Sequence, residues 1–199
     1  MKSTATPSIA PLATRAAALE SVLLEKGLIS AEISDGIHAL WDHWVPENGA
    51  RVVARAWTDA AYRERLLRDA ASACAELGFA GMESGRLVAL ENTPTLQHVI
   101  VCTLCSCTAW PVLGLPPDWY KSFEYRARVV REARQVLREM GLDLPPEVKI
   151  EVWDTTADTR YMVLPFRPDG TANWSEEELA RSVTKDCLIG VARPQAGSR

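Results

Sequence analysis

The chain has 199 residues, a length that suits one domain or one domain with an arm. Hydrophobic residues make up 47% and charged residues 24%, as in globular proteins, and the net charge of −4 argues against nucleic acid as the main partner. No apolar run is long enough to cross a membrane and no signal peptide is recognisable, so we expect a cytoplasmic protein whose thiols stay reduced.

The first part of the chain is predicted to be helical. Apolar residues recur at helical spacing in these segments: residues 14–26, 31–44, 50–57 and 60–77. Ser30 and Asp59 are suited to be N-caps, and Pro46 interrupts the pattern. We therefore predict an N-terminal helical arm, residues 1–48, and a second domain, residues 49–199.

The second part mixes strands and helices. Runs of Val, Leu and Ile predict strands at residues 86–92, 97–104, 148–154, 160–165 and 187–192. We expect the third and fourth of these to form a hairpin around one turn. A Pro- and Gly-rich loop begins at Trp110 and leads into a long helix at 118–140, and Ser175 with Glu178 forms a capping box. The fold class is α+β, with a helical arm followed by a layered α/β domain.

A cysteine cluster, "VCTLCSC", ends the strand predicted at 97–104 and contains Cys102, Cys105 and Cys107. A strand that ends in Cys-x-x-Cys-x-Cys can curl its backbone around one metal ion. Clustered thiols in a reducing compartment bind metal or do chemistry more often than they form disulfides. A structural zinc site is the plainer alternative, but it needs a fourth ligand, for which Cys187 and His98 are the candidates.

The motif and the residues after it resemble the α subunit of nitrile hydratase. The resemblance is carried by "VCTLCSC", "WPVLGLPP" and "WYKSFEYRARVVRE", and it is strong from about residue 91 to residue 194. It implies a long helical arm and an α/β-layered catalytic domain, which agrees with the elements predicted above. It also implies hydration of nitriles to amides.

The resemblance implies one low-spin Co(III) or Fe(III) ion per chain. The sulfurs of Cys102, Cys105 and Cys107 and the backbone nitrogens of Ser106 and Cys107 would hold it. Cys105 would be oxidised to sulfinic acid and Cys107 to sulfenic acid, which makes both catalytic candidates. Whether the Cys107 sulfenate oxygen or a water molecule attacks the nitrile stays open. Such an ion would act as a Lewis acid.

The choice between the two metals depends on the residue after the first cysteine. Threonine there usually accompanies cobalt in this family, so Thr103 favours Co(III). The stretches "CTAWP" and "YKSFEYRARVVRE" look more like the iron-type branch. We favour cobalt because position 103 adjoins the site.

Other residues are assigned to the substrate pocket or to a polar network near the metal by resemblance. They are Thr103, Trp110, Glu83, Asp154, Asp158 and Arg160. Core packing of Trp110 and a solvated turn with a surface ion pair at 154–160 are the alternatives. The family usually has glutamine where Glu83 stands. It usually has proline where Ala133 stands, so we predict a helix without a kink there.

Partners are also implied by the resemblance. A β subunit in an αβ or α2β2 assembly would supply arginines to the oxidised cysteines, and an activator or metallochaperone would deliver the metal. The substrate would be a small nitrile. Two hypotheses compete with this one. The first is the metal-binding subunit of thiocyanate hydrolase, whose pattern "TLKH…TRDCLIGVA" is similar to "TLQH" and "TKDCLIGVA" in this chain. The second is a non-catalytic zinc-binding assembly protein.

Overall fold

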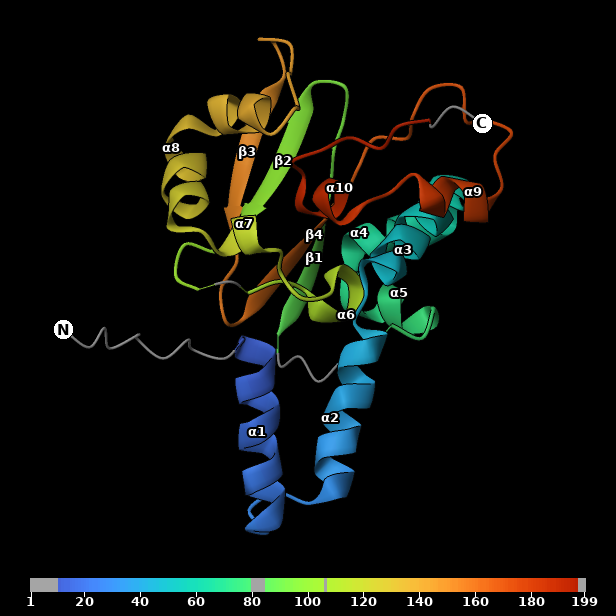
Figure 1. Ribbon diagram of the computed structural model, residues 1–199. Coiled ribbons are helices and arrows are strands. Elements are labelled where there is room, and N and C mark those ends of the chain that lie inside the picture. The colour runs from blue at the N-terminus through green and yellow to red at the C-terminus, as the bar shows by residue number, and fades with distance from the viewer. Residues whose placement is uncertain (1–10, 80–84, 106, 197–199) are drawn as a thin grey trace, which may run out of the picture. The chain divides into compact units, whose positions relative to one another are not determined.

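The computed structural model describes residues 11–79, 85–105 and 107–196 (Figure 1). The chain divides into two compact units, Met1–Asp42 and His43–Arg199. The domain boundary predicted after residue 48 stays a prediction. No helix in the described segments is both long and apolar enough to cross a membrane.

The N-terminal unit is built from helices α1 (Leu12–Glu25) and α2 (Ala31–His43), as predicted. Ser30 caps α2, because its hydroxyl oxygen accepts the N–H of Ile33 at 3.3 Å. The Ser34 hydroxyl donates to the carboxylate of Glu20, which ties the two helices together. The unit therefore holds itself together partly by polar contacts.

The strands of the second unit form two parallel pairs. Their bounds are β1 (Arg86–Glu91), β2 (Leu96–Val101), β3 (Lys149–Asp154) and β4 (Thr159–Leu164). β1 pairs with β4, and β2 pairs with β3. The hairpin predicted between the third and fourth strands, β3 and β4, is therefore wrong, because each of them pairs with a strand from earlier in the chain. The register places Val101, the last residue of β2, opposite Asp154, the last residue of β3.

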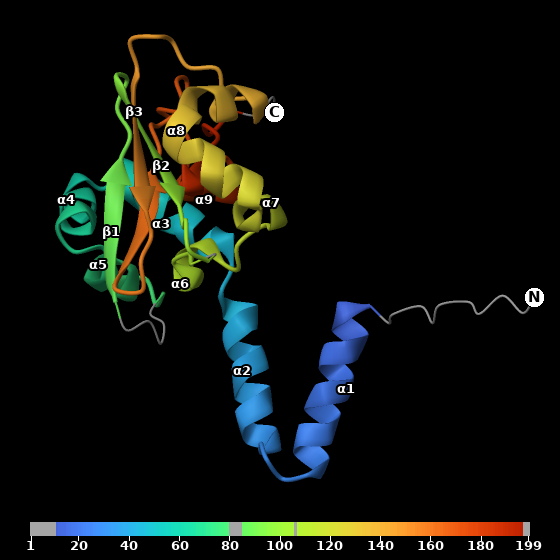
Figure 2. The same ribbon diagram turned by 90° about the vertical axis from the view of Figure 1, so that its left-hand side faces the viewer.

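Helices cover the strands on both sides, as Figure 2 shows. Their bounds are α3 (Pro46–Thr58), α4 (Ala60–Arg68), α5 (Ala70–Glu76), α6 (Trp110–Leu113), α7 (Asp118–Lys121), α8 (Phe123–Glu139), α9 (Glu176–Arg181) and α10 (Lys185–Ile189). α4 and α5 pack on β1, α8 packs on β3, and α10 packs on β2 and β4. Between them lies the core, whose fully buried side chains include Val53, Leu66, Ile100, Leu113, Leu137, Met162 and Leu188.

Several predicted helices differ from those observed. The helix predicted at 60–77 is interrupted at Asp69, whose carboxylate caps α5 through the N–H of Ser72. The segment from Trp110, predicted as a loop, contains the short helix α6. The helix predicted at 118–140 is divided at Ser122 into α7 and α8. The strand predicted at 187–192 is wrong, because α10 lies there and is capped by the Thr184 hydroxyl.

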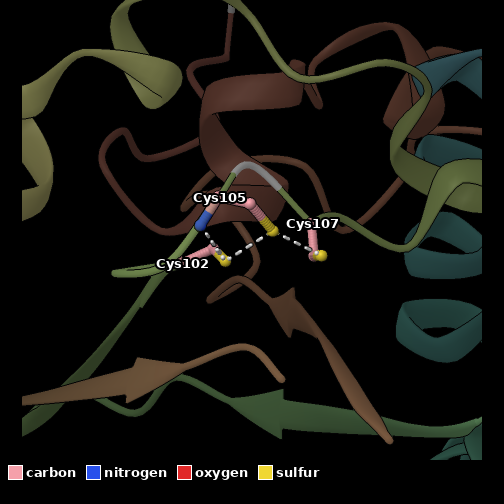
Figure 3. A group of neighbouring side chains, drawn as sticks. All are labelled: Cys102, Cys105 and Cys107. Carbon is pink, nitrogen blue, oxygen red and sulfur yellow. Dashed lines mark hydrogen bonds between the residues drawn. The ribbon is translucent and has the colours of Figure 1, made fainter. Parts of the chain in front are cut away.

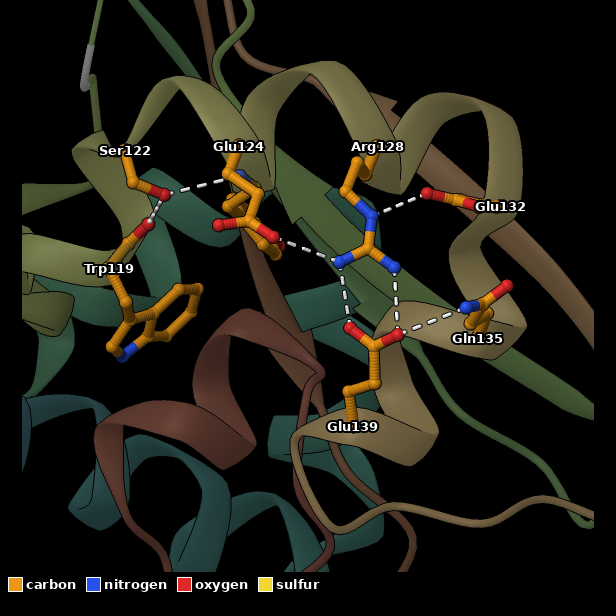
Figure 4. Close-up of polar contacts among 8 residues, drawn as sticks. Trp119, Ser122, Glu124, Arg128, Glu132, Gln135 and Glu139 are labelled. Atoms are coloured by element: carbon orange, nitrogen blue, oxygen red, sulfur yellow. Dashed lines mark hydrogen bonds and ion pairs between the residues drawn. The ribbon is translucent and has the colours of Figure 1, made fainter.

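Helix α8 bends at Glu132, where φ is −137° and ψ is 43°, so the predicted absence of a kink is wrong. Arg128 holds the two halves together across the bend (Figure 4). Its guanidinium donates to Glu124 at 3.1 Å, to Glu132, and to both carboxylate oxygens of Glu139 at 2.7 and 2.8 Å. These side-chain interactions accompany the bend, which therefore does not require a proline at Ala133.

Candidate metal centre

The sulfur atoms of Cys102, Cys105 and Cys107 converge where β2 ends (Figure 3). All three lie within 4.8 Å of one another. Cys105 Sγ is 3.4 Å from Cys102 Sγ and 2.9 Å from Cys107 Sγ, and the Cys105 N–H donates to Cys102 Sγ at 3.3 Å. We call residues 102–107 the metal loop, because this group could hold a metal ion.

The donor set and its exposure fit a transition-metal ion that protein covers from one side. Cys102 is buried, Cys107 is half-buried and Cys105 is exposed. Burial, with the Cys105 thiol, raises the pKa of Cys107 to about 11, and the Arg160 guanidinium acts in the opposite direction. A raised pKa means that the ionised thiol is disfavoured in the protein alone. A bound cation would stabilise these closely spaced sulfurs in the deprotonated form.

The fourth ligand that a structural zinc site would need is not found in the described segments. The sulfur cluster there includes neither His98 nor Cys187. The Nδ1 atom of His98 accepts the Trp153 Nε1–H at 2.9 Å, and burial lowers the pKa of this histidine. Cys187 is buried in α10, with its sulfur 3.2 Å from the Thr184 hydroxyl. Both residues therefore have structural roles.

Asp154 attaches the metal loop to the neighbouring strand. Its carboxylate accepts the Thr103 N–H at 2.9 Å and the Thr103 hydroxyl at 2.5 Å. The Thr155 N–H continues the pairing by donating to the Val101 carbonyl at 2.7 Å. The parallel register of β2 and β3 thus places Asp154 beside Thr103, so that hydrogen bonds hold the chain on both sides of Cys102.

We expect Asp154→Asn to weaken metal retention or activity about 10–100-fold, the usual effect of losing a residue that orients a metal ligand. An amide offers one acceptor oxygen where the carboxylate accepts two hydrogen bonds from Thr103. Metal content and kcat/KM of the purified complex would measure the effect. Asp143→Asn is the matched control, because Asp143 is exposed and pairs only with Arg138 in the described structure. Equal values for the two variants would contradict the expectation.

Arg160 lies in β4, opposite Leu87 of β1, and its electrostatic effect reaches Cys107. Its Nε and Nη1 atoms are buried, and neither has a hydrogen-bond partner within the described residues. The surface ion pair considered as an alternative is not seen there. Two buried, unsatisfied donors beside a sulfur cluster can instead donate hydrogen bonds to an anionic oxygen.

Two other predicted site residues, Asp158 and Trp110, are exposed. Asp158 is exposed in the turn before β4, where its backbone carbonyl accepts the Arg86 N–H at 2.8 Å. Trp110 begins α6 and is 37% exposed, with its ring 5.1 Å from that of Trp44. Glu83 and Ser106 lie outside the described residues.

Two residues that contact the metal loop were missed by sequence reasoning. Arg126 donates to the carbonyls of Leu104 and Cys105, each at 3.2 Å, and the Tyr120 hydroxyl donates to the Cys107 carbonyl at 3.1 Å. Arg126 lies in the charge-rich stretch "RARVVREARQVLRE", yet it is half-buried. No spacing rule signals a contact between residues this far apart.

Comparison with known proteins gives a consistent answer. The family model "Nitrile hydratase, alpha chain" matches residues 10–192. The chain is 51% identical over 189 residues to the low-molecular weight cobalt-containing nitrile hydratase subunit alpha of Rhodococcus rhodochrous, covering 94% of this chain and 91% of that protein. It is 45% identical over 195 residues to thiocyanate hydrolase subunit gamma of Thiobacillus thioparus, covering 90% and 79%.

A solved structure agrees with these sequence relatives. A double mutant of the Fe-type nitrile hydratase from Comamonas testosteroni Ni1 superposes with a TM-score of 0.86 at 52% identity. The superposition covers 96% of this chain and 93% of that one. The convergent sulfurs, the α+β fold and these matches lead to one conclusion: the chain belongs to the nitrile hydratase α chain family.

Proposed function

We propose that the chain is the catalytic α subunit of a nitrile hydratase, which adds water across the C≡N bond of a small nitrile to give an amide. The observation that carries this proposal is the convergence of three sulfurs within 4.8 Å at the end of β2. Family membership supports it, because the family model and the relative from Rhodococcus rhodochrous carry this activity in their names.

The metal ligands in this proposal are the sulfurs of Cys102, Cys105 and Cys107, with the backbone nitrogens of Ser106 and Cys107. One ion per chain, Co(III) rather than Fe(III), is proposed from Thr103. The relatives leave this choice open, since one is cobalt-containing and a comparably similar one is Fe-type. When bound, such an ion supplies Lewis-acid activation of the nitrile or of the attacking oxygen.

The chain's own residues prepare the site around this group. We propose that Cys105 carries two added oxygen atoms and Cys107 one, with molecular oxygen as the oxidant. Arg160 supports this assignment, because its two unsatisfied donors could pair with an oxygen on Cys107. The exposed part of Trp110 is proposed to line the substrate pocket, and Glu83 and Asp158 to contribute to the polar network around it.

Partners and location complete the proposal. A β subunit, in an αβ or α2β2 assembly, would cover the metal loop and supply further cationic donors. Leu104, which is 86% exposed at the crest of the loop, supports such a cover. An activator or metallochaperone would deliver the metal, and the complex would work in the cytoplasm.

Purification of the tagged chain from its own host, with the chains that accompany it, tests the proposal. We expect about one cobalt ion per chain by elemental mass spectrometry, amide formation from acetonitrile or benzonitrile, and peptide masses that show the added oxygens on Cys105 and Cys107. Iron would overturn only the cobalt assignment. Zinc bound to unmodified cysteines, without turnover, would overturn the catalytic proposal in favour of an assembly protein.

Thiocyanate hydrolysis is the second candidate, and the 45% identity to a thiocyanate hydrolase subunit is the observation that favours it. The same purified complex distinguishes the two activities. Ammonia release from thiocyanate, with no amide formed from nitriles, would assign the chain to that reaction. A higher kcat/KM for nitriles would assign it to nitrile hydration.

A further inference from the structure

We propose that Arg126 is a positioning residue for the metal loop: its guanidinium holds the loop crest and keeps the three sulfurs converged. The proposal rests on the proposed function in one respect, that the loop binds a metal ion. Arg126 lies on α8, well separated in sequence from the cysteines.

The contacts of Arg126 join the start of α8 to the loop. Its Nη1 donates to the carbonyl oxygens of Leu104 and Cys105, both at 3.2 Å. Its Nε donates to the Ser122 carbonyl at 3.4 Å, so the guanidinium is also anchored at the helix N-terminus. Hydrogen bonds from a charged donor are stronger than neutral ones, and one nitrogen here fixes two successive carbonyls.

Polar contacts attach the loop crest, residues Leu104 and Cys105. The Leu104 side chain is 86% exposed, so apolar packing does not fix this point of the backbone. Asp154 fixes the loop at Thr103, and Tyr120 fixes it at Cys107. Arg126 supplies an attachment between these two, at Leu104 and Cys105.

The position of Arg126 is not explained by the stability of its helix. It lies close to the N-cap Ser122, at the end of α8 where the macrodipole is positive and a cation is disfavoured. The carbonyls of the metal loop compensate for this placement.

The base of the Arg126 side chain is held rigidly relative to the strand that carries the loop. Tyr125, the preceding residue, is buried, and its hydroxyl donates to the Ile100 carbonyl in β2 at 2.8 Å. Ser122 caps the helix by accepting the Tyr125 N–H at 3.1 Å. The first turn of α8 therefore cannot move away from β2 without breaking the hydrogen bond between Tyr125 and Ile100.

The contact with Cys105 has a second consequence. The Cys105 carbonyl and the Ser106 nitrogen belong to one peptide group, in which oxygen and nitrogen share electron density. A guanidinium fixed at the oxygen draws density from the nitrogen that the proposed function assigns to the metal. Loss of Arg126 should thus change the absorption spectrum of the bound ion as well as its retention.

The test compares Arg126→Gln, Arg126→Lys and Arg131→Gln in the complete complex purified from the host. Arg131 is the matched control: it lies on the same helix, is exposed, and donates to Ala127 within its own helix. Metal content, the rate of metal loss to a chelator, the visible absorption spectrum and the unfolding temperature are measured for each.

We expect Arg126→Gln to lose metal about 10–100-fold faster than the wild type, with a shifted absorption band and an unfolding temperature near that of Arg131→Gln. Arg126→Lys keeps the charge without the planar fork, so it should recover part of the retention. If Arg126→Gln folds poorly, Arg126→Lys provides a second variant on which metal loss and the absorption spectrum can be measured. Unchanged metal loss and spectrum in both Arg126 variants would overturn this proposal alone, whereas a wild-type complex without metal would overturn the proposed function as well.

Discussion

Replacement of Cys102 by serine is expected to leave the complex with almost no bound metal and no measurable nitrile hydration. Cys102 is 1% exposed and lies at the base of the metal loop, where its sulfur is 3.4 Å from Cys105 Sγ. A serine hydroxyl is a much poorer ligand for a sulfur-preferring ion, and its buried position excludes replacement by another side chain. Metal per chain and amide formation by the purified complex measure the result.

Cys74→Ala is the matched control for this substitution. Cys74 is also 1% exposed, but it lies in α5, outside the sulfur cluster, and burial raises the pKa of its thiol to about 12. We expect this variant to keep its metal and to lose about 1 kcal/mol of unfolding free energy from the small cavity. A Cys102→Ser complex with a full complement of metal would show that the ion is held elsewhere.

Replacement of Gly190 by alanine is expected to cause the largest loss of stability, roughly 2–5 kcal/mol of unfolding free energy. Gly190 ends α10 with φ at 92°, a left-handed conformation that alanine adopts only under strain. An added Cβ would also lie 2.1 Å from the carbonyl oxygen of His98 in β2, so the strand would have to shift. Urea unfolding of the purified complex measures the loss.

Gly170→Ala separates the two causes. Gly170 also has a positive φ, 76°, but a Cβ there would meet nothing within 4 Å, so only the backbone strain remains. We expect this control to lose about 1–2 kcal/mol. Because β2 leads directly into Cys102, Gly190→Ala should reduce metal content too. Equal losses of stability in the two variants would mean that the close approach to β2 contributes nothing.

The sequence predicted the sulfur cluster and most helix starts. Cys102, Cys105 and Cys107 are so close along the chain that one turn of backbone brings their sulfurs together. The caps at Asp59 and Ser175 depend only on the N–H three residues later, which sequence spacing specifies. Local features of this kind can be predicted because they need no knowledge of tertiary contacts.

Short apolar segments were harder to assign. The run "CLIGVA" is compatible with a buried strand or a buried helix, since periodicity cannot distinguish them over so few residues. The Thr184 cap and the left-handed Gly190 make it helix α10. The kink in α8 could not be predicted either, because no proline marks it. The Arg128 bonds to Glu132 and Glu139 that accompany the bend are seen only in the folded structure.

The surroundings of the metal loop were decided by the tertiary structure. Parallel pairing of β2 with β3 brings Asp154 to Thr103, and the packing of α8 brings Arg126 to the Cys105 carbonyl. Strand order and register depend on which apolar faces are buried together, which a single sequence does not specify. The sequence by itself therefore determined which atoms could bind a metal, and the tertiary structure determined what holds them in place.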